Sequence, residues 1–195
     1  MSNHIRNSKT TPQEAEGITT IELLIVVVIL GIAASVSIVG MNSVLRRERI
    51  NSVALEVAGW LEEVRNLAAR RVDSSTGTGG CAITLSPGSS MTSGAVLASV
   101  ETACSPRDAQ QLRVPGNLSG STVSMASTNG NSIIFTPRGL WIASPAVSGA
   151  LEIKLLLDGG GPLRCVRLSE TLGSVDIGRA NATTVSASCS DYVAL

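Results

Sequence analysis

The sequence has few of the residues from which catalytic sites are built. It contains one histidine, His4, and its 15 lysine and arginine residues balance 15 aspartate and glutamate residues. No set of nucleophile, base and acid can be assembled around His4, and the sequence has neither a G-x-x-x-x-G-K-[ST] motif nor a metal-ligand cluster. The near-zero net charge argues against a globally basic nucleic-acid binder. We therefore expect a protein that is not an enzyme, with no cofactor and no metal.

Aromatic residues are also scarce, at 2 % of the chain, which suits a thin β-rich domain with many turns. The four cysteines, Cys81, Cys104, Cys165 and Cys189, lack the C-x-x-C spacing of zinc and redox sites. Two disulfides are the economical interpretation. Three pairings are open, and sequence proximity favours Cys81 with Cys104 and Cys165 with Cys189.

What the chain does have is one long apolar run, Gly17 to Leu45, in which Glu22 is the one ionisable residue. About 20 apolar residues in a helix span a bilayer core. The run therefore predicts a transmembrane helix over residues 18–45.

The start of this run carries a family resemblance. Gly17 is followed by a hydrophobic residue and then by Thr20, Ile21, Glu22, Leu23 and Leu24. This pattern resembles the type IV prepilin signal of pilins and type II secretion pseudopilins. The resemblance implies that a prepilin peptidase removes a leader, residues 1–17, between Gly17 and Ile18, and that Ile18 is then N-methylated. It also implies a single-pass inner membrane protein with its C-terminal domain in the periplasm or on a pilus.

Glu22 is the informative residue, because a carboxylate in an apolar membrane helix costs roughly 2.5–3.5 kcal/mol. In the pilin family this carboxylate is thought to neutralise the N-terminal amine of a neighbouring subunit. The resemblance thus implies that Glu22 acts in assembly with other pilins through the N-terminal helix. The alternative is an ordinary membrane anchor in which Glu22 reaches the interface.

Beyond the apolar run the pattern becomes amphipathic. Apolar residues recur at three- and four-residue intervals and form one stripe: Val53, Val57, Trp60, Leu61, Val64, Leu67 and Ala68. No proline interrupts Ile18 to Arg71, so we expect one long helix. Its amphipathic half, 46–72, should pack on an antiparallel β-sheet domain, 73–195. The predicted fold class is α+β, and the resemblance implies a pilin-like architecture.

Short β-type runs separated by turn residues follow the helix. They are Cys81 to Leu85, Ala95 to Val100, Val123 to Met125, Ser132 to Thr136, Leu151 to Leu157, Leu163 to Leu168 and Val175 to Ile177. The clearest hairpin spans 155–168. Alternation along its two strands predicts one buried and one polar face. The small-residue stretches Ser86 to Gly94 and Ser119 to Asn131 are expected to be loops.

Two of these segments, Ile134 to Gly139 and Leu163 to Ser169, resemble sheet segments of the GspH/FimT family of minor pilins and pseudopilins. This resemblance implies a structural subunit of a type II secretion pseudopilus or a type IV pilus. Some FimT-type members bind DNA in natural transformation through a Gly-Arg-x-Arg motif. Here Ser174 and Asp176 stand where those arginines would fall, which removes phosphate attraction.

Two other functions stay open. Arg138, Arg164, Arg167 and Arg179 would serve DNA uptake if they formed one basic face, although solvated arginines on a sheet explain them equally well. An enzyme tethered by a simple anchor would need a cleft with a perturbed acid–base pair.

Overall fold

The computed structural model describes residues 17–71, 79–104, 110–143, 149–169 and 173–194, without the side chains of 36–40. The predictions for the leader 1–16, including His4, lie outside these residues. The chain divides into two compact units, Met1–Asn42 and Ser43–Leu195. The second half of the helix therefore belongs to the same unit as the β-strands.

One α-helix, α1, runs Thr20–Ala69 over 50 residues, where Ile18 to Arg71 was expected. Its last turn tightens, because the amides of Arg70 and Arg71 donate to the carbonyls of Leu67 and Ala68 at 3.1 and 3.0 Å. Such i→i+3 bonds satisfy carbonyls that an α-helix leaves open at its end.

The transmembrane prediction needs correction. A crossing requires about 20 consecutive apolar residues in a helix. Within the part of the chain that the structure describes, we find no helix that combines the length and the apolarity needed for a bilayer. This finding overturns the predicted transmembrane half, 18–45, and the predicted single-pass location in an inner membrane.

The amphipathic stripe on the second half of α1 is confirmed. Every predicted member is buried except Leu67, which is partly buried against the core. Ile50, Ala54 and Ala58 extend the same buried face. The charged side chains of Arg49, Glu56, Glu63 and Arg70 lie away from this face and are exposed. Helical periodicity thus identified the face that packs on the sheets.

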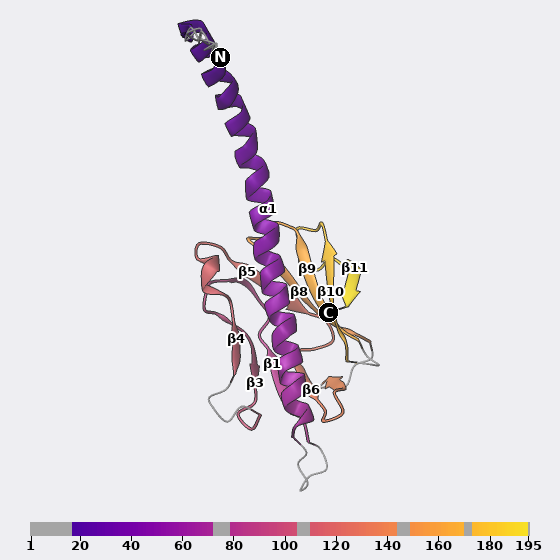
Figure 1. The fold of residues 1–195 in the computed structure, drawn as a ribbon. Helices are drawn as coiled ribbons and strands as arrows, with labels where there is room; N and C mark the ends of the chain where they lie inside the picture. The colour runs from indigo at the N-terminus through magenta and orange to yellow at the C-terminus, as the bar shows by residue number, and fades with distance from the viewer. Residues whose placement is uncertain (1–16, 72–78, 105–109, 144–148, 170–172, 195) are drawn as a thin grey trace, which may run out of the picture. The chain divides into compact units, whose positions relative to one another are not determined.

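The β-domain contains two antiparallel sheets where a single sheet was predicted. The strand orders are β4-β3-β1-β6-β7 and β11-β10-β9-β8-β5-β2, and the second half of α1 packs on both (Figure 1). The bounds are β1 Cys81–Leu85, β2 Gly88–Met91, β3 Val96–Val100, β4 Gln111–Arg113, β5 Val123–Ser127, β6 Ser132–Phe135, β7 Trp141–Ala143, β8 Leu151–Leu157, β9 Leu163–Leu168, β10 Val175–Ala180 and β11 Ser190–Ala194. A short 3-10 helix, η1, spans Gly116–Leu118.

All seven predicted strands are present with small shifts at their ends, and the β8–β9 hairpin is confirmed. Four further strands, β2, β4, β7 and β11, were not predicted. One of them, β2, lies in the stretch Ser86 to Gly94 that was expected to be a loop, and β5 lies in the second expected loop. All four missed strands are at sheet edges. These strands have only three to five residues each, so their sequences show little of the apolar alternation that marks a longer strand.

The β8–β9 hairpin is covered on both faces, which corrects the prediction of one polar face. Toward α1, its apolar residues join an inner core that contains members of α1 and both sheets. On the other face Leu156, Leu163 and Cys165 are buried under a segment that includes Ala187, Cys189 and Tyr192. We call this second group the outer cluster. Lys154, the residue before the 155–168 span on β8, is only 7 % exposed because it lies within this covered surface.

Candidate functional site

The predicted assembly site lies at the start of α1. The Glu22 carboxylate accepts hydrogen bonds from the Thr19 amide and hydroxyl, both at 3.0 Å, and the Glu22 amide donates to the Thr19 hydroxyl at 3.3 Å. This reciprocal arrangement is a capping box, which satisfies amides that the first turn leaves open. The two hydrogen bonds from Thr19 hold the pKa of Glu22 below its usual value, so the carboxylate is ionised at neutral pH.

The capping box gives Glu22 a second role that was not predicted from the sequence. The signal was present, since Thr19 and Glu22 form the Thr-x-x-Glu pattern that precedes an apolar run. The Glu22 carboxylate therefore stabilises the first turn of its own helix, whether or not it also pairs with a charge on another subunit.

The apolar side chains after Glu22 are exposed in the single chain. They include Leu23, Leu24, Ile25, Val26, Val27, Val28, Ile29, Leu30 and Ile32, each at least 51 % exposed. Monomeric proteins rarely expose apolar surfaces of this continuity, and such surfaces mark interaction sites. Gly17 and Ile18, the predicted processing site, are exposed as well.

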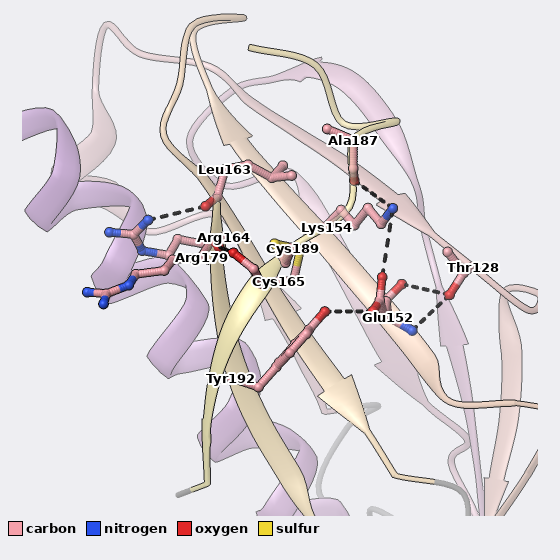
Figure 2. Close-up of a disulfide and its surroundings, with 11 residues drawn as sticks. Thr128, Glu152, Lys154, Leu163, Arg164, Cys165, Arg179, Ala187, Cys189 and Tyr192 are labelled. Atoms are coloured by element: carbon pink, nitrogen blue, oxygen red, sulfur yellow. Dashed lines mark hydrogen bonds and ion pairs between the residues drawn. A yellow bond between two sulfur atoms is a disulfide. The ribbon is translucent and has the colours of Figure 1, made fainter. Parts of the chain in front are cut away.

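Both predicted disulfides are confirmed. Cys81 joins Cys104, and Cys165 joins Cys189. The first closes a segment between β1 and the turn after β3, and the second fastens the outer cluster to β9 (Figure 2). Their role is therefore structural, and they hold the sheets on which the remaining candidate residues lie.

Figure 2 shows how polar groups of the outer cluster satisfy one another. The Lys154 ammonium donates to the Ala187 carbonyl at 2.7 Å and lies 3.8 Å from the Glu152 carboxylate. Glu152 also accepts from the Tyr192 hydroxyl at 2.6 Å. Desolvation, followed by this hydrogen bond, raises the pKa of Tyr192 well above its usual value. Because these groups are paired with one another, they offer no free acid–base pair for catalysis.

The four candidate arginines do not form one basic face. Arg164 and Arg167 are three residues apart on β9, so they project from opposite faces of the sheet. Arg164 is directly opposite Arg179 on β10, on the face that packs against α1. Arg167 is directly opposite Asp176 and pairs with it at 3.0 Å, while its guanidinium lies 3.7 Å from the centre of the Tyr192 ring.

Arg138 is separate from all three. The next residue, Gly139, accepts a hydrogen bond from Arg65 near the end of α1, whereas Arg164 bonds to Asn51. Asn51 and Arg65 are 14 positions apart on the helix, which corresponds to about 21 Å. Arg164 and Arg179 therefore form a like-charged pair, and Asp176 neutralises Arg167. Arg138 lies apart from the other three.

No family model, curated protein or solved structure matches this chain.

Proposed function

We propose that the protein is a structural subunit of a filament, a minor pilin or type II secretion pseudopilin, that joins its neighbours through the first half of α1. The observation that carries this proposal is the exposed apolar surface between Ile18 and Ile32, in which Glu22 is the one charged residue. Burying a large aliphatic side chain contributes about 1.5–3 kcal/mol, so packing this surface against the same helix in other subunits would strongly favour assembly.

The proposed assembly also uses the charge of Glu22. Cleavage after Gly17 by a prepilin peptidase would create an amine on Ile18, N-methylated in the proposed mature subunit. An ionised carboxylate among apolar side chains requires a partner charge once water is excluded. The amine of a neighbouring subunit supplies that charge, and head-to-tail contacts of this kind extend into open filaments.

The candidate arginines do not support the DNA-uptake alternative, because they are divided among three places. A nucleic-acid backbone needs clustered lysine and arginine residues along its path.

The capping box requires two variants to separate the roles of Glu22. Glu22→Gln removes the charge, but an amide at this position still completes a capping box. Thr19→Ala disrupts the box and leaves the charge. We expect Glu22→Gln to lose incorporation into filaments sheared from the native host, and Thr19→Ala to retain it. Equal incorporation of the two variants would contradict the charge-pairing role.

Mass spectrometry of the sheared filaments tests the processing step separately. The expected mature N-terminus is methylated Ile18. An intact 1–17 leader on incorporated protein would refute processing at Gly17.

A further inference from the structure

A pocket outside the proposed assembly surface gathers three arginines from three elements. Arg47 comes from α1, Arg164 from β9 and Arg179 from β10, and together they line a cavity of about 350 Å³. Figure 2 shows the guanidinium groups of Arg164 and Arg179 on the same side of the sheet. Residues far apart in the sequence thus bring three positive charges to one cavity.

This arrangement is electrostatically unfavourable in the free protein. Like charges at directly opposite positions of neighbouring strands destabilise a sheet, and Arg164 and Arg179 occupy such positions. Desolvation lowers the pKa of Arg164, and the charges of Arg179 and Arg47 lower it further, whereas Glu48 opposes them. An anion bound among the three guanidinium groups would relieve this repulsion.

The one carboxylate that lines the pocket, Asp191, does not neutralise it. Asp191 lies 3.7 Å from the Nε atom of Arg179, but both side chains are about two-thirds exposed, so the ion pair is weak. Among the described residues, Arg47 makes no ion pair. The charged residues that line the pocket are three arginines and one aspartate, Asp191, so their net charge is +2.

The guanidinium of Arg164 is held in place by two hydrogen bonds. Its Nε atom donates to the Asn51 side chain at 3.4 Å, and its Nη1 atom donates to the Leu163 carbonyl at 3.2 Å. A fixed guanidinium loses little conformational freedom when an anion binds, and its fork suits the geometry of an oxyanion.

We propose that the pocket lined by Arg47, Arg164 and Arg179 binds a single phosphate group, either as the free ion or as the monoester of a small molecule. A phosphate monoester carries about −1.5 to −2 charges at neutral pH, which matches the net charge of the lining side chains. A polymer is not favoured, because Arg167 faces the opposite side of the sheet and pairs with Asp176. The proposal is independent of filament assembly.

Calorimetric titration of the purified full chain with inorganic phosphate tests the proposal, with chloride used to keep the ionic strength constant. Saturable binding is expected. Arg47→Gln and Arg179→Gln should each weaken it at least about ten-fold, because each removes a charge-assisted hydrogen bond to the anion. The matched control is Arg70→Gln, which makes the same charge change 23 positions later, directly after the end of α1 and about 34 Å away. This variant should bind phosphate like the wild type.

A second titration with glycerol 3-phosphate distinguishes the two sources of the phosphate group. Equal affinity for both probes supports the free ion, and tighter binding of the ester supports a small phosphorylated molecule. The proposal is overturned if phosphate shows no saturable binding, or if Arg70→Gln weakens binding as much as the pocket variants do. Binding of a short oligonucleotide that Arg70→Gln also weakens would indicate a diffuse polyanion surface and would overturn it too.

Discussion

The disulfide between Cys165 and Cys189 allows a quantitative test of how the outer cluster is held. The bonded cysteines are 24 positions apart, for which the chain-entropy model gives about 3.5 kcal/mol of stabilisation. The covering segment contributes small side chains, Ala182, Val185 and Ala187, and one aromatic residue, Tyr192. We therefore expect Cys165→Ala/Cys189→Ala to lower the free energy of unfolding in urea by about 3.5 kcal/mol.

The matched control removes the other disulfide. Cys81→Ala/Cys104→Ala opens a loop with a separation of 23, so its entropic effect is nearly the same. The two variants differ in location, because only the first releases the segment that carries Tyr192. Tyr192 is the sole tyrosine of the chain, so phenolate absorbance reports this segment alone.

The pKa of Tyr192 should fall toward its ordinary value of 10 in Cys165→Ala/Cys189→Ala, because the phenol loses its burial and its bond to Glu152. In Cys81→Ala/Cys104→Ala it should stay raised. If Cys165→Ala/Cys189→Ala lowered the free energy of unfolding by less than about 1 kcal/mol, or left the Tyr192 titration unchanged, the disulfide would not be what holds the segment that carries Tyr192.

Two further predictions concern packing and pH. Leu61→Ala should lower the free energy of unfolding by about 2–5 kcal/mol, because Leu61 is fully buried. Leu55→Ala, at an exposed position of the same helix, should change it by less than about 1 kcal/mol. Equal losses in the two variants would contradict the buried stripe on α1. Since the folded pKa of Tyr192 is raised, its contribution to stability is complete below pH 10 and is lost as the pH rises through the folded pKa. Urea unfolding across this alkaline range should therefore show a smaller loss of stability for Tyr192→Phe than for the wild type, and parallel curves would count against the Glu152 bond.

The parts of the fold that periodicity predicts are those with a buried side. The stripe from Val53 to Ala68 and the strands of the β8–β9 hairpin place apolar residues at regular intervals because each packs on the inner core. The edge strand β2, Gly88–Met91, has no buried residue and gave no such signal. Periodicity also fails where both faces of a strand are covered, because polar residues such as Lys154 are then buried as well.

The candidate sites were predicted less well than the fold, for a different reason. The cysteines pair with the next cysteine along the chain, so proximity was enough to identify both bonds. The arginines depend on register, since a shift of one residue moves a side chain to the other face of the sheet. Arg47 was not selected because nothing in the sequence relates a helix residue to two strands more than 100 positions later.

The pairing of the cysteines also affects how the protein is made. Each disulfide joins cysteines that follow one another in order of synthesis, so an oxidase that acts on thiols as they emerge forms both native bonds without rearrangement. The intervals between Cys81 and Cys104 and between Cys165 and Cys189 do not overlap. A mispaired intermediate therefore requires oxidation to lag behind elongation, and the biogenesis of this chain should depend on a thiol oxidase more than on a disulfide isomerase.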